Sequence, residues 1–77
     1  MPTLKETIMY TTKSCKGCLK GKELLNNLGK NFIEKDIKDE GNLAEMINET
    51  GQMTVPVFKI GNKIIVGFNR REIESSV

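Results

Sequence analysis

Short apolar blocks alternate with polar stretches along the first third of the chain. The block Thr7–Thr11 is rich in β-branched residues and is followed by the polar turn Thr12-Lys13-Ser14, a pattern that predicts a strand. From Cys15 to Leu28 apolar residues recur at helical spacing with charged residues between them, and Gly29 provides a stop signal. We therefore expect a strand followed by a helix, with Ser14 as the N-cap.

The middle of the chain repeats this order of strand and helix. The stretch Phe32–Ile37 predicts a second strand, although its alternation is imperfect. Asn42 and Glu45 stand three residues apart, as in a helix capping box, and Gly51 ends the run that follows them. The apolar face of this second helix is formed by Leu43, Met46 and Ile47.

The last third of the chain predicts a hairpin and a short helix. Val57–Ile60 and Lys63–Val66 are apolar blocks joined by Gly61-Asn62, a pair that suits a two-residue turn. Asn69 then caps a helix that begins at about Arg70 and turns Ile73 inward. The order β-α-β-α-β-β-α requires a parallel strand pair, joined through the first helix by a right-handed crossover. We expect one α/β domain over residues 1–77, with a four-stranded mixed sheet flanked by three helices.

Composition excludes several classes of protein. The chain has 77 residues, 38% of them hydrophobic and 29% charged, which is ordinary for a single globular domain. Its net charge of +2 is weak, and its four aromatic residues are not interleaved with a basic run. Neither feature is typical of a nucleic-acid-binding protein. The apolar stretches are too short to span a membrane. The alternating residues Met1–Tyr10 lack the pattern of a secretory signal, so we expect a cytoplasmic protein.

Candidate chemistry is concentrated in Cys15-Lys16-Gly17-Cys18, because the chain has two cysteines and no histidine. The first thiol lies where a strand has ended and a helix begins, among unpaired N–H groups that favour a thiolate. Cys18 lies one turn further along the same helix face, within bonding reach of Cys15 but more enclosed. We therefore expect Cys15 to attack disulfides and Cys18 to resolve the mixed disulfide, with no cofactor.

A metal or iron–sulfur site is the alternative reading of the same pair. Tetrahedral zinc needs four ligands, and this chain supplies two cysteines. A zinc site within one chain is therefore not expected, but two chains together have enough thiolates for a four-cysteine site or a cluster. A carrier of an iron–sulfur cluster absorbs visible light and is dimeric, whereas an exchange catalyst is colourless and monomeric.

A third motif, Thr54-Val55-Pro56, reads by itself as an ordinary trans proline at the entry to a strand. Together with Tyr10-Thr11, the cysteine pair and Gly67-Phe68, however, its order and spacing resemble the glutaredoxin-like proteins over nearly the whole chain. The resemblance implies a thioredoxin fold with a cis Pro56 facing the dithiol. It also implies that the backbone at Val55 pairs with a bound substrate chain.

Within this family the chain is most similar to the NrdH-redoxins. Lys16-Gly17 stands between the cysteines, and Asn69-Arg70 stands where glutathione-binding relatives carry an acid. The resemblance to NrdH-redoxins implies electrons taken from thioredoxin reductase and delivered to ribonucleotide reductase. A glutathione-dependent glutaredoxin remains the alternative, with Lys13 positioned for a glutathione carboxylate. The expected substrate-binding residues are Lys13, Thr54, Val55, Pro56, Gly67 and Phe68.

Overall fold

The computed structural model describes residues 6–76 and has the predicted order of elements. The strands are β1 (Thr7–Thr11), β2 (Ile33–Asp36), β3 (Val57–Ile60) and β4 (Lys63–Val66). The helices are α1 (Lys16–Asn27), α2 (Glu40–Thr50) and α3 (Arg70–Ser76). Residues 1–5 and Val77 of the expected domain, including most of the segment assessed as a secretory signal, lie outside the described residues. None of the helices in residues 6–76 has the length and apolar character needed to cross a membrane.

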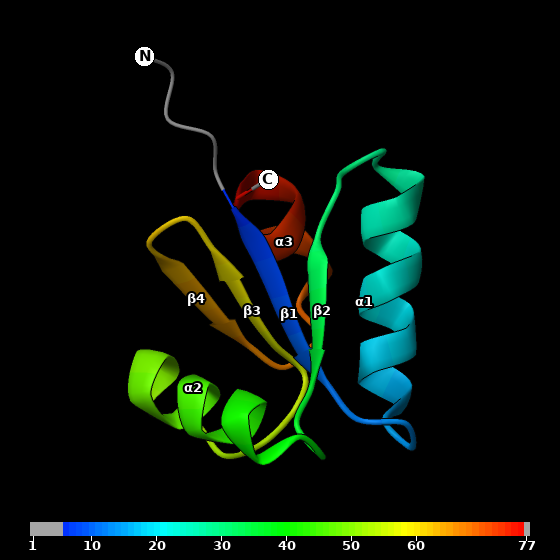
Figure 1. The fold of residues 1–77 in the computed structure, drawn as a ribbon. Helices are drawn as coiled ribbons and strands as arrows, with labels where there is room; N and C mark the ends of the chain where they lie inside the picture. The colour runs from blue at the N-terminus through cyan, green and yellow to red at the C-terminus, as the bar shows by residue number, and fades with distance from the viewer. Residues whose placement is uncertain (1–5, 77) are drawn as a thin grey trace.

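The four strands form one mixed sheet in the order β2-β1-β3-β4 (Figure 1). As expected, β1 and β2 are parallel, whereas β3 is antiparallel to both β1 and β4. In the hairpin between β3 and β4, the positive φ falls on Gly61 alone, at 59°. This topology, with three helices packed on the sheet, is the thioredoxin fold.

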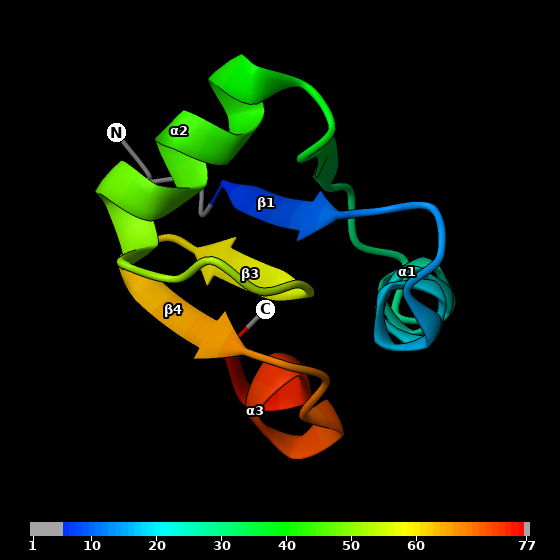
Figure 2. The ribbon, with the colours of Figure 1, turned by 90° about the horizontal axis from the view of Figure 1, so that it is seen from below.

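Helices cover both faces of the sheet and create two apolar layers (Figure 2). On one face, α1 and α3 cover a cluster of buried residues: Met9, Cys18, Leu24, Leu25, Phe58, Ile60, Ile65 and Ile73. On the other face, α2 covers a smaller cluster: Ile8, Tyr10, Met46 and Val57. Successive residues of β1 enter opposite layers because side chains alternate along a strand. All five residues of β1 are buried as a result.

Two of the three predicted helix caps are corrected by the structure. The N-cap of α1 is Cys15 and not Ser14, because the Cys15 sulfur accepts a hydrogen bond from the N–H of Cys18. Helix α2 begins earlier than expected, capped by Asp39, whose carboxylate accepts from two backbone N–H groups. Asn69 caps α3 as predicted, since its side chain accepts from the N–H of Glu72.

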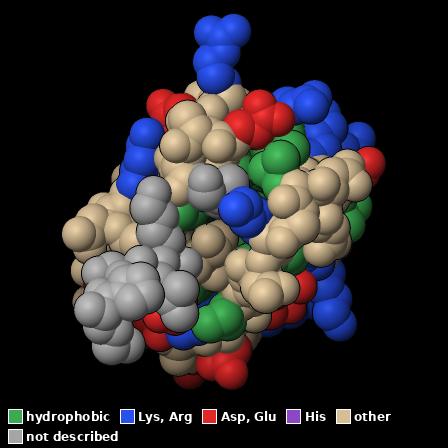
Figure 3. Space-filling view, turned by 90° about the horizontal axis from the view of Figure 1, so that it is seen from above, with side chains coloured by type: hydrophobic (Ala, Val, Ile, Leu, Met, Phe, Trp, Pro, Cys, Tyr) green, Lys and Arg blue, Asp and Glu red, His purple; other side chains and the backbone are tan. Residues whose placement is uncertain are grey.

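Strand directions bring three chemically interesting segments to one end of the molecule. The end of β1 leads into α1, and Tyr10 pairs with Val57 at the start of β3. Val57 in turn pairs with Val66 at the end of β4. The residues just beyond these strands therefore meet at the lower end of Figure 1, which we call the redox end. The opposite end, seen in Figure 3, shows basic and acidic side chains intermixed and small, separate hydrophobic areas.

Candidate active site

The two thiols lie at the first turn of α1, where the redox end meets the helix. Cys15 is partly exposed, whereas Cys18 is 1% exposed and belongs to the larger apolar cluster. The backbone N–H of Cys18 donates a hydrogen bond to Sγ of Cys15 at a distance of 3.1 Å. This bond and the positive end of the helix dipole both stabilise negative charge on the Cys15 sulfur. The more accessible sulfur is thus also the one that receives a donor.

Cys18 is held as a neutral thiol by its surroundings. Burial, followed by its hydrogen bond with Cys15 and the charge of Cys15, raises the pKa of Cys18 to about 12. A backbone hydrogen bond from Thr12 and the positive charge of Lys22 act in the opposite direction on this pKa. The two sulfurs therefore differ in exposure and in hydrogen bonding, as an attacking and a resolving thiol must.

Lys22 is fixed beside Cys18 by contacts with the sheet. It lies four residues after Cys18, on the same face of α1. Its ammonium forms an ion pair with Glu34 of β2, and the same carboxylate accepts a hydrogen bond from the hydroxyl of Thr11 at 3.0 Å. These contacts hold a positive charge near the buried thiol.

Pro56 forms the wall opposite the dithiol. The Val55–Pro56 peptide bond is cis, as the family resemblance implied. The motif by itself predicted a trans bond, because most bonds before proline are trans. The carbonyl of Pro56 accepts a hydrogen bond of 2.8 Å from the N–H of Gly67, which has a φ of 80° that favours glycine. A Cβ on Gly17 would lie 3.2 Å from Cδ of Pro56. The proline ring therefore packs directly over Gly17, one of the two residues between the cysteines.

The predicted site residues differ in how far the structure buries them. Phe68 is 37% exposed, and its Cβ would lie 3.7 Å from a Cβ on Gly17, so this aromatic residue borders the dithiol. Val55 packs against both apolar clusters. Lys13 and Thr54 are exposed, and neither side chain forms a hydrogen bond or ion pair with another residue in the described part of the chain.

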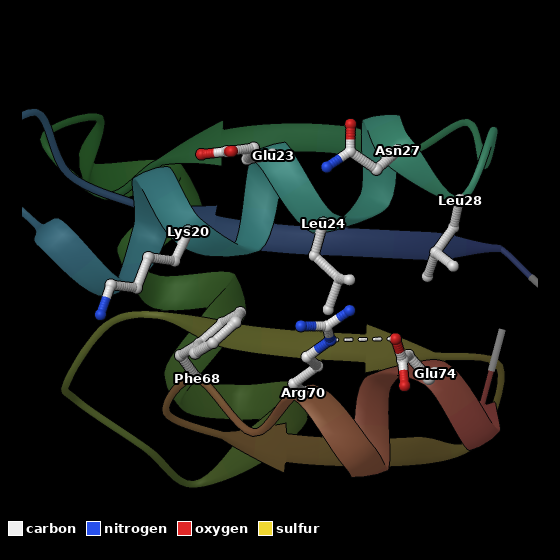
Figure 4. Close-up of a pocket in the computed structure, with 8 residues that line it drawn as sticks. All are labelled: Lys20, Glu23, Leu24, Asn27, Leu28, Phe68, Arg70 and Glu74. Atoms are coloured by element: carbon white, nitrogen blue, oxygen red, sulfur yellow. Dashed lines mark hydrogen bonds and ion pairs between the residues drawn. The ribbon is translucent and has the colours of Figure 1, made fainter.

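A groove between α1 and α3 continues from Phe68 away from the dithiol (Figure 4). Its volume is about 420 Å³. The lining residues are Lys20, Glu23, Leu24, Asn27, Leu28, Phe68, Arg70 and Glu74. On the α3 side, Arg70 forms an ion pair of 3.1 Å with Glu74. Sequence reasoning missed this groove because its two walls are about 45 residues apart in the chain.

Two glycines of α1 were also missed, although glycine inside a helix is itself a signal of close packing. Gly17 lies under the Pro56 ring, as described above. Gly21 lies one turn further on, where a Cβ would overlap the Phe58 ring and come within 2.9 Å of Cε of Met9. Close contact of α1 with the sheet therefore depends on Gly21.

The acidic and cysteine side chains of the described residues are dispersed. Among residues 6–76, no group of three or more cysteine, aspartate or glutamate side chains is placed to hold a metal ion. The chain has no histidine.

Comparison with known proteins identifies the family. A sequence model of the glutaredoxin family matches residues 7–65. The chain belongs to the glutaredoxin family. An uncharacterised glutaredoxin-like 8.6 kDa protein in the rubredoxin operon of Clostridium pasteurianum is 36% identical over 70 residues, covering 90% of this chain and 93% of the relative.

Solved structures of family members and related proteins share the fold. The glutaredoxin from Methanosarcina mazei Go1 superposes with a TM-score of 0.79 at 31% identity, covering 92% of this chain and 76% of the other. The NrdH-redoxin from Escherichia coli, described as glutaredoxin-like with a thioredoxin-like activity profile, has a TM-score of 0.79 at 24% identity. That comparison covers 91% of this chain and 92% of the NrdH-redoxin, and at this identity it supports the fold.

Proposed function

We propose that this glutaredoxin-family protein is a dithiol–disulfide oxidoreductase that reduces protein disulfides through Cys15 and Cys18. The observation that carries the proposal is the contrast between the two sulfurs. The partly exposed Cys15 accepts the N–H of Cys18 at 3.1 Å, while burial keeps Cys18 protonated. An accessible, stabilised thiolate is the nucleophile that disulfide exchange requires.

The first step forms a mixed disulfide. The Cys15 thiolate attacks one sulfur of the substrate disulfide, the substrate S–S bond breaks, and the departing sulfur leaves as a thiolate that takes a proton from solvent. Pro56 packs over Gly17, two residues after the attacking Cys15. We assign the backbone of Val55, next to Pro56, to pairing with the substrate chain, which binds as an added strand. Thr54, Gly67 and Phe68 complete the substrate-binding surface.

The second step releases the substrate. Cys18 loses its proton and attacks Sγ of Cys15, which forms the Cys15–Cys18 disulfide and expels the second substrate thiolate. Two of the influences that raise the Cys18 pKa come from Cys15, namely its hydrogen bond and its charge. Both are weakened once the Cys15 sulfur is bound to the substrate, so the resolving thiol becomes more acidic after the first step. Two electrons pass to the substrate, and no bound cofactor is needed.

The electron donor is assigned to thioredoxin reductase rather than to glutathione. A glutathione site of the usual family type needs a carboxylate for the glutathione amino group, and this chain has Asn69 and Arg70 at that place. The Asn69 side chain is occupied in capping α3, and Arg70 pairs with Glu74. A charge-assisted hydrogen bond is worth about 1.5–3 kcal/mol, so its absence weakens glutathione binding about 10- to 150-fold.

We further assign the protein to the cytoplasm, as a monomer, with ribonucleotide reductase as a disulfide-bearing partner of the kind that NrdH-redoxins serve. The absence of a membrane-spanning helix in residues 6–76 is compatible with this assignment. The weak net charge of +2 gives no reason to invoke nucleic acid as a partner.

Reduction of one oxidised sample by two donor systems tests the proposal. The expected result is fast reduction by NADPH with thioredoxin reductase and slow reduction by glutathione with NADPH and glutathione reductase. Faster turnover with glutathione contradicts the donor assignment and leaves the dithiol mechanism intact. The Cys15→Ser variant is the control and is expected to have no activity with either donor.

A further inference from the structure

Folding gathers basic residues from distant parts of the sequence at the redox end of the molecule. Four segments meet at the redox end: residues 11–22, residues 36–41, residues 51–58 and residues 67–71. Together they contain seven of the twelve basic residues and three of the ten acidic residues, and all three of these acids lie in residues 36–41. This end therefore carries more net positive charge than the whole chain, whose net charge is +2.

Three of these basic side chains are exposed around the dithiol without a carboxylate partner. Lys13 precedes Cys15, Lys16 follows it, and Lys20 lies one turn further along the same face of α1. Within residues 6–76, none of these three lysines forms an ion pair. By contrast, Lys35 and Lys59, which lie on the sheet, each pair with a glutamate.

Two of the carboxylates at the end of β2 and the start of α2 are occupied by local contacts. Asp36 accepts the backbone N–H of Lys38 at 2.9 Å. Asp39 accepts the N–H groups of Gly41 and Asn42 as the cap of α2. These acids serve the turn and the helix start, and the lysines beside Cys15 remain available to another molecule.

The groove between α1 and α3 provides a path for a bound segment. Its mouth lies between Lys20 and Phe68, next to the dithiol (Figure 4). From Lys20 to Leu28 the α1 wall is about 12 Å long at 1.5 Å per residue, a length that holds about four residues of extended chain. Leu24 and Leu28 supply apolar contacts along this wall. Because Glu23 and Glu74 also line the groove, it suits the apolar residues of a bound segment, while the carboxylates of that segment stay at the mouth.

We propose that the redox end binds an acidic segment of the disulfide-bearing protein substrate. Carboxylates beside the substrate disulfide pair with Lys13 and Lys16, and the segment continues past Lys20 into the groove between α1 and α3. This inference rests on the proposed disulfide-reductase function and specifies the class of substrate. Long-range attraction also speeds the encounter of oppositely charged surfaces, so the preference extends to association rates.

Two disulfide peptides of equal length test the preference, one with aspartate and glutamate around its cystine and one with lysine at the same positions. With the reduced protein at low ionic strength, the acidic peptide is expected to react about tenfold faster or more. At 0.5 M NaCl the two rates are expected to converge, because salt screens exposed charges. Equal rates at low salt overturn the proposal.

Charge reversal locates the site. Lys20→Glu is expected to reduce the preference for the acidic peptide severalfold, whereas the matched variant Lys63→Glu, at the far end of β4, is expected to retain it. An equal loss in both variants overturns the placement at the groove mouth. The neutral disulfide of 2-mercaptoethanol should be reduced equally by the parent protein and by Lys63→Glu, and the rate of each variant with the acidic peptide is divided by its own rate with this neutral disulfide. No reduction of the neutral disulfide by the parent protein signals failure of the proposed enzymatic function instead.

Binding without chemistry separates the two proposals completely. Versions of the peptides with serine in place of both cysteines cannot react, and their binding is followed by fluorescence anisotropy. Tighter binding of the acidic version supports the docking proposal even for a protein that reduces nothing. Equal binding of the two versions at low salt contradicts it.

Discussion

The backbone N–H of Cys18 points at Sγ of Cys15, 3.1 Å away, so one cysteine stabilises the charged form of the other while its own sulfur is buried. Iodoacetamide is therefore expected to alkylate Cys15 well before Cys18 at pH 7, because Cys18 is 1% exposed and burial raises its pKa to about 12. Peptide mass spectrometry at increasing reaction times measures the order. Preferential labelling of Cys18 would reverse the assigned roles.

Replacement of Cys15 and replacement of Cys18 are expected to stop the reaction at different steps. Cys15→Ser removes the attacking sulfur and should abolish disulfide reduction. Cys18→Ser keeps the nucleophile and should accumulate mixed disulfides with substrate, which non-reducing mass spectrometry detects as an added mass. A Cys18→Ser protein that turns over at the parent rate without added glutathione would exclude Cys18 as the resolving thiol.

Lys22 is expected to accelerate the resolving step. Its positive charge lowers the pKa of Cys18, opposing the larger effect of burial. Lys22→Gln should therefore slow release of substrate from the mixed disulfide about fivefold at pH 7, the effect of about 1 kcal/mol of charge interaction. Stopped-flow measurement of the released thiol follows this step. Lys22→Arg keeps the charge and should stay near the parent rate, so equal slowing in both variants argues against an electrostatic role.

Gly21 is expected to tolerate no side chain. Alanine normally favours a helix over glycine by about 1 kcal/mol, but a Cβ at Gly21 would overlap the Phe58 ring and contact Met9. Overpacking of this kind costs about 1–3 kcal/mol, so Gly21→Ala should lower the free energy of unfolding in urea. Leu19→Ala is the control, because Leu19 is 60% exposed on the same helix and should change stability little. A more stable Gly21→Ala protein would show that α1 packs less closely than described.

Glu45 is expected to make stability dependent on acidic pH. Hydrogen bonds from Lys35, and then from Tyr10, lower the pKa of the Glu45 carboxyl. A lowered folded-state pKa gives stability that is fully present above the unfolded value of about 4.3 and is lost as the pH falls through the folded value. Glu45→Gln should therefore lower the free energy of unfolding by about 1 kcal/mol at pH 7 and by less at pH 3.

The control for this pH dependence is Glu23→Gln, an exposed glutamate whose side chain forms no hydrogen bond or ion pair among the described residues. Urea unfolding of both variants at pH 7 and pH 3 gives the comparison. A loss of stability in Glu45→Gln that is the same at both pH values would show that the carboxylate charge is not its source.

Much of the fold was predictable because the apolar periodicities agree with the topology. All seven elements, the parallel pairing of β1 with β2 and the cap at Asn69 follow from local patterns. The caps of α1 and α2 were predicted wrongly, because Ser14 and Asn42 are residue types that commonly cap helices and both lie near the helix starts. The structure instead uses a cysteine sulfur at Cys15 and an aspartate three residues before Asn42.

The site was predictable only in part. The cysteine pair is visible in the sequence, and the helical spacing of the apolar residues that follow it predicts that the pair lies at the start of a helix. The cis bond before Pro56 depended on the family resemblance, because proline base rates favour trans. The groove and the positive redox end depend on contacts between distant segments, and the distribution of lysines along the chain gives no sign of either.

The hydrogen bond from Gly67 to the carbonyl of Pro56 joins the residue after β4 to the residue before β3. The dithiol beside them belongs to a third segment, the start of α1. The thiols come from the first quarter of the chain, and the wall that faces them comes from its last third. A truncated peptide can therefore retain both sulfurs and still lack the surface on which substrate is held. Loss of catalysis during denaturation should consequently coincide with loss of the whole sheet, which makes turnover itself a reporter of cooperative unfolding.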